Sequence, residues 1–187
     1  MSLSAYDEGG RRKYLSLAEG KRFIERSCVL PLREQLFCKL LYFSGCRISE
    51  ALSLTLNDID FEENYLRVRT LKQRSKATVR RIPVPQELAK KLEENATDDG
   101  KLWNFSRTTA WREVKLVMLV SEIYGPQASP KGLRHGFGVR CALAGIPVTQ
   151  IQDWMGHSSV ETTAIYLDVR DGEERELMSR TWNFIEK

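Results

Sequence analysis

The run Tyr65-Leu66-Arg67-Val68-Arg69-Thr70 alternates apolar and basic side chains along its length. An alternation with a period of two is typical of a β-strand that is buried on one face. A second β-rich segment follows over residues 78–84, and the polar run 72–76 lies between the two. Two such runs joined by a polar turn predict an antiparallel β-hairpin, which the prolines at 83 and 85 bring to an end.

On both sides of this hairpin the apolar residues recur with helical spacing. We expect a first helix to begin near Ser16, because Ser16 and Glu19 fit a capping box. A second helix is predicted over Leu32–Ser44 and ends at Gly45. The remaining helical spans are 46–57, 86–96, 107–123, 131–144, 148–155, 159–166 and 171–184. The sequence therefore predicts a mainly α fold with one small antiparallel hairpin, an α+β architecture.

The composition of the 187 residues limits the class of protein. With 42% hydrophobic and 29% charged residues it is ordinary for a globular domain. The formal net charge of +4 permits a nucleic-acid partner without requiring one. No run of about 18 uncharged apolar residues is present, so we expect no membrane span. The four cysteines lack metal-ligand spacing, and we interpret them as free buried thiols of a cytoplasmic protein. Residues 1–15, with Gly9-Gly10 and a basic run, are interpreted as a linker or tail.

The residues suited to chemistry are dispersed along the chain. The two histidines are His135 and His157, the first directly after Arg134, and Tyr166 follows the second by nine residues. Arg47 lies far upstream, in the segment 44–52. Taken one at a time, these residues fit a surface, cap or core position equally well.

Taken in order, Arg47, Arg134, His157 and Tyr166, with a basic hairpin between the first two, resemble the tyrosine recombinase (phage integrase) family. Ser44–Leu52 is similar to the family's first arginine box, and Gly132–His135 to its second. Leu143–Tyr166 is similar to its C-terminal box. The resemblance covers nearly the whole chain and implies the tyrosine recombinase catalytic-domain fold. It divides the chain into a tail, 1–15, and a catalytic domain, 16–187, without the N-terminal core-binding domain.

The resemblance implies a DNA strand-transfer enzyme, and the chemistry explains why it needs these residues. Tyr166 would attack a phosphodiester and form a covalent 3′-phosphotyrosyl intermediate. Arg47 and Arg134 would clamp the phosphate oxygens, and His157 would add a hydrogen bond. A hairpin lysine would protonate the leaving 5′ oxygen, with Lys72 favoured and Lys76 the alternative. Such a site requires no metal or cofactor, because arginine and lysine supply the positive charge.

Three further residues are assigned around this set. The family often has histidine three residues before its second arginine, where this chain has Lys131, which suits a phosphate contact better than an acid–base role. Glu50 and His135 are expected to support the site. The candidate DNA contacts are Arg67, Arg69, Arg74, Arg80, Arg107 and Arg112. For the helix 107–123 the alternative is a solvated amphipathic helix with Trp111, Val114 and Val117–Leu119 packed inward.

The resemblance also implies double-stranded DNA as partner and a place on the nucleoid. Four protomers would assemble on DNA by exchanging the C-terminal helix, 171–184, whose alternative is packing on its own domain. Two rival functions stay open: a DNA-binding regulator of the same fold without strand cleavage, and a type IB-like topoisomerase. The chain is either a fragment of a longer recombinase or a short member, and in both cases we expect weak, salt-dependent DNA binding.

Overall fold

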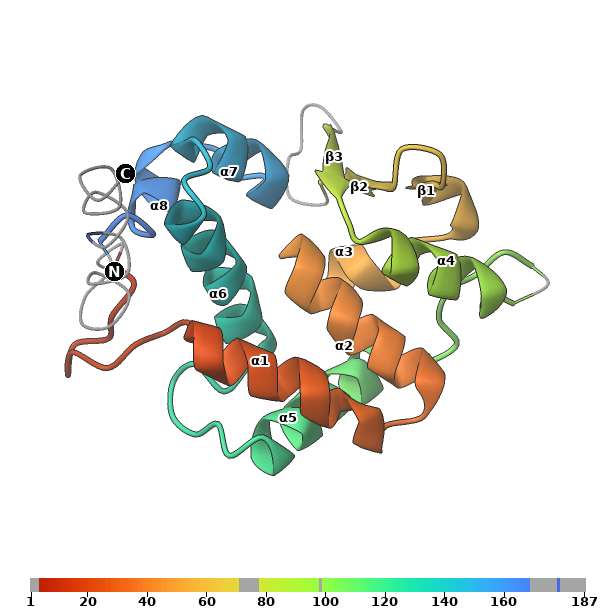
Figure 1. The fold of residues 1–187 in the computed structure, drawn as a ribbon, viewed down its shortest axis with the longest axis horizontal. Helices are drawn as coiled ribbons and strands as arrows, with labels where there is room; N and C mark the ends of the chain where they lie inside the picture. The colour runs from red at the N-terminus through yellow and green to blue at the C-terminus, as the bar shows by residue number, and fades with distance from the viewer. Residues whose placement is uncertain (1–3, 71–77, 98, 169–177, 179–187) are drawn as a thin grey trace, which may run out of the picture.

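The computed structural model describes residues 4–70, 78–97, 99–168 and residue 178, whose arrangement Figure 1 shows. Four sequence predictions lie outside the described residues. They concern the hairpin residues Lys72, Arg74 and Lys76 and the C-terminal helix over 171–184.

The first helix begins, and the second begins and ends, where the sequence predicts. In α1 (Leu17–Arg26) the Ser16 hydroxyl accepts a hydrogen bond from the Glu19 N–H, and the Glu19 carboxylate accepts one from the Ser16 N–H. This reciprocal pair confirms the capping box. After the short 3₁₀ helix η1 (Ser27–Val29), α2 (Leu32–Ser44) is apolar on most sides and forms the centre of the main core. It ends at Gly45, whose φ of 62° turns the chain toward the next helix.

The segment 46–57 is broken rather than continuously helical. It forms α3 (Ile48–Leu52) and the 3₁₀ helix η2 (Leu56–Asp58). The Trp103 indole N–H donates to the Ala51 carbonyl over 2.7 Å and so occupies an acceptor that a longer helix would use. The Thr55 N–H, which a longer helix would donate to the same carbonyl, donates instead to the Asp58 carboxylate over 2.9 Å, so a local capping box and the distant Trp103 both contribute to the end of α3.

The predicted hairpin is confirmed as part of a small antiparallel sheet. Strands β2 (Tyr65–Arg69) and β3 (Val79–Pro83) pair with Leu66 opposite Ile82 and Val68 opposite Arg80. Within the described residues, β1 (Ile59–Asp60) adds a third strand next to β2. This strand is missing from the prediction because two residues are too few to show an alternation. The mainly α architecture with one small sheet is thus confirmed.

After the sheet, the described chain is helical. Its helices are α4 (Gln86–Glu94), α5 (Arg107–Val120), α6 (Pro130–Leu143), α7 (Val148–Met155) and α8 (Glu161–Ala164). Helix α6 packs beside α2, and its buried residues join a second core cluster with α7 and Tyr166 (Figure 1). The four cysteines are unpaired as predicted, although Cys28 is exposed. Within the described ranges, no helix is both long and apolar enough for a membrane span.

The N-terminal residues differ from the predicted linker or tail. Tyr6 pairs with Arg12 in an isolated β-bridge, and the hydroxyls of Tyr6 and Tyr14 are 3.2 Å apart. Tyr14 and Leu15 are 0% and 1% exposed. Residues 4–15 therefore pack as part of the domain, because burying aromatic rings outweighs the freedom that the paired glycines give this segment.

Candidate active site

The predicted catalytic residues that the structure describes line one cavity of about 1220 Å³. The cavity lies between the start of α3, the helix α6 and the segment that follows α7. Its wall includes Arg47, Lys131, Arg134, His135, His157 and Tyr166. Residues separated by more than a hundred positions in the sequence thus meet around one space, which is the arrangement that the resemblance predicts.

Arg47 is fixed at the first turn of α3 by Glu50. The Glu50 carboxylate accepts the Arg47 backbone N–H over 2.9 Å and Arg47 Nη1 over 2.7 Å. Burial raises the pKa of this carboxyl, but hydrogen bonds and charge from Arg80, with hydrogen bonds from Arg47, outweigh it and hold the pKa at about 2. Glu50 therefore stays ionised at neutral pH and holds Arg47 through two hydrogen bonds.

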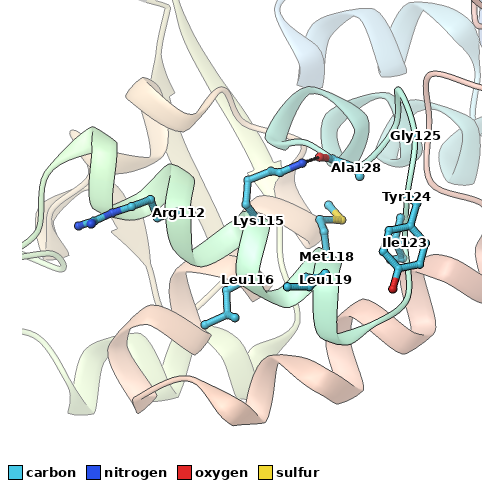
Figure 2. Close-up of a pocket in the computed structure, with 9 residues that line it drawn as sticks. All are labelled: Arg112, Lys115, Leu116, Met118, Leu119, Ile123, Tyr124, Gly125 and Ala128. Atoms are coloured by element: carbon cyan, nitrogen blue, oxygen red, sulfur yellow. Dashed lines mark hydrogen bonds between the residues drawn. The ribbon is translucent and has the colours of Figure 1, made fainter.

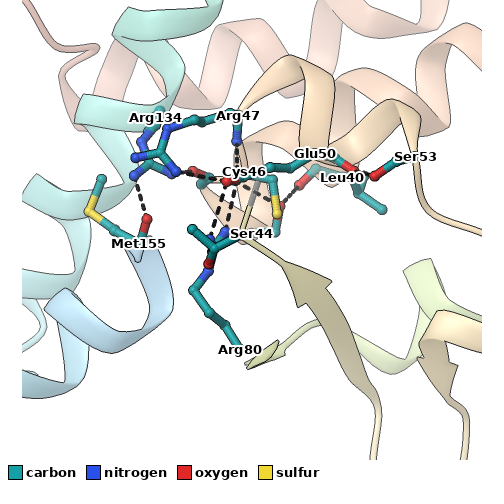
Figure 3. Close-up of polar contacts among 11 residues, drawn as sticks. Leu40, Ser44, Cys46, Arg47, Glu50, Ser53, Arg80, Arg134 and Met155 are labelled. Carbon is teal, nitrogen blue, oxygen red and sulfur yellow. Dashed lines mark hydrogen bonds and ion pairs between the residues drawn. The ribbon is translucent and has the colours of Figure 1, made fainter. Parts of the chain in front are cut away.

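Arg134 is held from α6 by two backbone carbonyls. Its Nη1 donates to the Gly45 oxygen over 2.7 Å and its Nη2 to the Met155 oxygen over 2.5 Å (Figure 3). Burial, followed by repulsion from Arg47, lowers the pKa of the Arg134 guanidinium to about 10. The group remains charged at neutral pH, so the cavity holds two positive guanidinium groups, and the ionised Glu50 partly offsets their repulsion.

Tyr166 rests in a buried slot beside α6 and is 1% exposed. Its hydroxyl lies 2.9 Å from His135 Nδ1, and its ring lies directly over Gly138. Burial raises the pKa of the Tyr166 phenol to about 12, although Arg134 and Arg47 oppose the rise. The phenol is therefore protonated at rest, and a side chain on Gly138 would collide with its ring.

Both histidines of the cavity are neutral at physiological pH. Burial, followed by the charges of Lys131 and Arg134, lowers the pKa of His135 to about 4. Burial, followed by Arg134 and Arg47, lowers the pKa of His157 to about 3. His157 Nδ1 lies 2.9 Å from the Thr163 hydroxyl, and when that hydroxyl donates, the ring carries its proton on Nε2 and can donate it to a ligand.

The hairpin arginines divide between the two faces of the sheet. Arg67 and Arg69 are exposed, as DNA contacts require, and Arg67 Nη2 lies 3.2 Å from the Asp60 carboxylate. Arg80 is 6% exposed and pairs with Glu50, so the prediction that Arg80 contacts DNA is wrong. The alternation of the strand already indicates that Arg80 is buried, because Arg80 and the core residue Ile82 are two positions apart and lie on the same face.

Helix α5 presents its two predicted DNA contacts to different spaces. Arg107 lines the active-site cavity together with Trp111, one helical turn later. Arg112 instead borders a second hollow of about 450 Å³ with Leu116, Leu119 and Tyr124 (Figure 2). Of the residues that the alternative packs inward, Val114, Val117 and Met118 are buried, whereas Trp111 and Leu119 are 49% and 58% exposed.

The N-terminal segment also contributes to the cavity, which the sequence analysis did not predict. Asp7, Glu8, Arg11 and Lys13 all line it, and Arg11 Nε lies 2.9 Å from the Asp7 carboxylate. The basic run 11–13 was the available signal, but the neighbouring glycines favoured a linker. The cavity is accordingly bordered by charges of both signs on this side and mainly by cations on the other.

This fold, with a phenol, two guanidinium groups and two imidazoles around one cavity, is that of a tyrosine recombinase catalytic domain. The chain belongs to the phage integrase family, whose model matches residues 13–173. The resemblance seen in the sequence is thereby confirmed.

Individual relatives agree with this assignment. The tyrosine recombinase XerA of Pyrococcus furiosus is 34% identical over 181 residues, which are 90% of this chain and 61% of the relative. The tyrosine recombinase XerD of Yersinia pestis is 27% identical over 165 residues, 79% of this chain and 54% of the relative. A crystal structure of XerA recombinase is similar with a TM-score of 0.77 and 28% identity, over 90% of this chain and 64% of that one.

The chain matches only part of the length of its full-length relatives. The catalytic domain of bacteriophage HP1 integrase has the same fold, with a TM-score of 0.67 and 20% identity, and the match covers 89% of this chain and 93% of that domain. The chain spans about three fifths of the full-length XerA that it matches. It therefore corresponds to the catalytic portion of its longer relatives.

Proposed function

We propose that this chain is the catalytic domain of a site-specific DNA recombinase that cuts and rejoins strands through Tyr166. The observation that carries the proposal is the single cavity shared by Arg47, Arg134, His157 and Tyr166. A DNA-binding regulator would need the basic surface but would gain nothing from a tyrosine buried among two arginines and two histidines. That combination supports strand cleavage as the function.

The proposed reaction is a transesterification at one phosphodiester. Tyr166 gives its hydroxyl proton to solvent water, its oxygen bonds to phosphorus, and the bond from phosphorus to the 5′ oxygen breaks as that oxygen takes a proton from the hairpin lysine. Arg47 and Arg134 donate to the non-bridging oxygens as negative charge gathers there, with His157 donating from Nε2. Lys131, exposed at the cavity wall, adds a positive charge near the phosphate. Reversal by a 5′ hydroxyl from another strand rejoins the DNA and releases the tyrosine.

Lys72 is proposed as the acid that protonates the leaving 5′ oxygen, with Lys76 as the alternative. Both lie outside the described residues, but the strand ends next to them lie near the site. The Thr70 N–H donates to the Thr78 carbonyl over 3.0 Å, which closes the hairpin at this point. The Thr70 hydroxyl accepts from Arg80, which in turn holds Glu50. The described end of β2 at Thr70 is therefore connected through Arg80 and Glu50 to Arg47, which supports the choice of a hairpin lysine as the acid.

Duplex DNA is the proposed partner, and four copies are proposed to act together. A XerH recombinase whose structure is 18% identical was solved bound to its difH substrate, which for this chain supports the fold alone. In this chain Arg107, Trp111 and Lys13 extend the wall of the cavity beyond the catalytic residues and would contact DNA on either side of the cut. Each lost phosphate contact should weaken binding and lower its salt dependence.

Trapping of a covalent adduct tests the cleavage proposal. The full chain is incubated with a library of nicked duplexes with randomised arms, in which the short fragment released by cleavage diffuses away. Wild-type protein should form a covalent protein–DNA product visible on a denaturing gel, and Tyr166→Phe should form none. The matched control is Tyr6→Phe, because Tyr6 is the other tyrosine that lines the cavity; it should form the adduct as the wild type does.

The possible outcomes separate the candidate functions. An adduct from Tyr166→Phe would show that another residue is the nucleophile. DNA binding without any adduct from the wild type would favour the regulator. Adduct formation with equal efficiency on every library sequence would favour a topoisomerase, because site preference is what distinguishes a recombinase from it.

A further inference from the structure

Arg80 is a buried charge that the reaction described above does not use. Its side chain is 4% exposed and that of Glu50 is 1% exposed. The two form a bidentate pair, with Arg80 Nη1 3.2 Å from Glu50 Oε1 and Arg80 Nη2 2.9 Å from Oε2. Burying an ion pair has a large desolvation cost, so such a pair is a poor source of stability alone. The contribution of the pair to the protein therefore lies in the groups that it positions.

Glu50 connects Arg80 to the phosphate-binding Arg47. The oxygen that accepts Arg80 Nη1 also accepts Arg47 Nη1 over 2.7 Å, and the oxygen that accepts Arg80 Nη2 also accepts the Arg47 backbone N–H over 2.9 Å (Figure 3). The planar fork of Arg80 fixes the plane of the carboxylate. The carboxylate in turn fixes one edge of the Arg47 guanidinium and leaves its other nitrogens for a ligand.

Arg80 also contacts two further segments that carry predicted catalytic residues. Its Nη1 donates to the Thr70 hydroxyl over 3.0 Å, at the strand end that leads to Lys72. The same Nη1 lies so close to Gly156 that a Cβ there would be 2.5 Å away, and His157 is the next residue. The start of α3, the hairpin and the turn after α7 therefore meet at one guanidinium group.

We propose that Arg80 is a positioning residue that sets the catalytic orientation of Arg47 through Glu50 while it locks the base of the hairpin against the Gly156–His157 turn. The inference rests on the proposed cleavage reaction and assigns Arg80 no contact with DNA. It accounts for the placement of an arginine, rather than an apolar residue, on the inner face of β3 beside Ile82.

The test compares Arg80→Met with Arg81→Met. Arg81 is the adjacent residue on the opposite, exposed face of β3, so the two variants lose the same charge one position apart. Arg80→Met should slow single-turnover adduct formation about a hundredfold, the loss that a misplacement of ~1 Å can cause. Its affinity for DNA should stay within about threefold of the wild-type value, because no phosphate contact is removed. Arg81→Met should keep both the rate and the fold.

The pH profile separates positioning from a simple loss of folding. Wild-type Glu50, with a pKa near 2, is ionised throughout pH 5–8. Without Arg80, only the hydrogen bonds from Arg47 oppose the rise in the Glu50 pKa that burial causes. Arg134 and the Cys46 thiol are the other titratable groups in electrostatic range of Glu50. The Glu50 pKa should then rise, and the rate of Arg80→Met should fall further below the wild-type rate as the pH decreases. Adding Glu50→Gln to Arg80→Met should remove this extra pH dependence.

Each result decides the inference. Equal rates for Arg80→Met and Arg81→Met would overturn it, as would a rate loss that is constant with pH and matches the unfolded fraction seen by circular dichroism. Should Arg80→Met fail to fold, Arg80→Lys takes its place: one ammonium keeps the charge without the fork, and a slow rate with normal DNA affinity is expected. A wild-type protein that forms no adduct would instead refute the cleavage proposal itself.

Discussion

Replacing Gly138 by alanine tests directly whether Tyr166 rests in the buried slot beside α6. A Cβ at Gly138 would lie 2.5 Å from Cδ2 and Cε2 of the Tyr166 ring and 2.8 Å from its Cγ. Ordinary carbon–carbon contacts are about 3.5–4.0 Å, so ring or helix would have to shift by about 1 Å. Overpacking of this kind costs about 1–3 kcal/mol. Glycine-to-alanine in a helix interior otherwise gains about 1 kcal/mol.

The two effects have opposite signs, which makes the result informative. Gly138→Ala should lower the free energy of unfolding by up to about 2 kcal/mol in the wild-type background. In a Tyr166→Ala background the ring is gone, and the same change should raise it by about 1 kcal/mol. The coupling between the two sites is then about 1–3 kcal/mol, which urea unfolding of the four proteins in the cycle measures.

A second readout follows the phenol itself. The pKa of Tyr166, raised by burial to about 12, should fall toward its ordinary value near 10 in Gly138→Ala as the ring is displaced. Absorbance titration of the phenolate, with Tyr166→Phe subtracted, reports this change. Stabilisation by Gly138→Ala of equal size in both backgrounds, together with an unchanged phenol pKa, would refute the buried resting position.

Two other predictions concern the protonation of the leaving group and of the two histidines. A DNA with a 5′-phosphorothiolate at the cut should restore cleavage to Lys72→Ala, because sulfur leaves without a proton, while restoration of Lys76→Ala alone would assign the acid to Lys76. The pKa values of His135 and His157, about 4 and about 3, lie below the ordinary 6.5, so the unfolded chain binds more protons as the pH falls. The free energy of unfolding, measured in urea from pH 7 to 5, should therefore decrease below about pH 6.5. The decrease is at most about 1.4 kcal/mol per pH unit for each histidine, and it is smaller for the more exposed His157. The variant His135→Gln should lose the part of the decrease that His135 causes.

The parts of the fold that the sequence predicts correctly depend on signals between near neighbours. The capping box at Ser16, the glycine that ends α2 at position 45 and the alternation of Tyr65–Arg69 each act within a few residues. The break after α3 involves the distant Trp103 besides the local capping box at Thr55, and the packing of Tyr14 depends on partners far along the chain. Those contacts are set by tertiary packing, which no local periodicity contains.

For the site, the sequence identified the residue types, and the structure supplied their connections. The motifs predicted Arg47, Arg134, His157 and Tyr166, and all four line one cavity. The role of Arg80 was misassigned, because a basic segment with no acids nearby in the sequence was interpreted as a surface. Its acidic partner, Glu50, is thirty residues away and becomes its neighbour only when β3 packs against α3.

The resting hydrogen bond between Tyr166 and His135 holds the proposed nucleophile but does not activate it. Transfer of the phenol proton to His135 would run from a pKa of about 12 to one of about 4, an uphill step on the order of 10 kcal/mol. Burial is the largest cause of both shifts. A phosphate that neutralises Arg134 would raise the pKa of His135, but it would also raise that of the phenol, because Arg134 and Arg47 lower the phenol pKa, so the step stays uphill. Bringing the phenol to phosphorus therefore requires Tyr166 to leave His135 and its slot over Gly138. A substitution that frees the ring without unfolding the domain should accordingly speed adduct formation, whereas the loss of Arg47 or Arg134 should slow it.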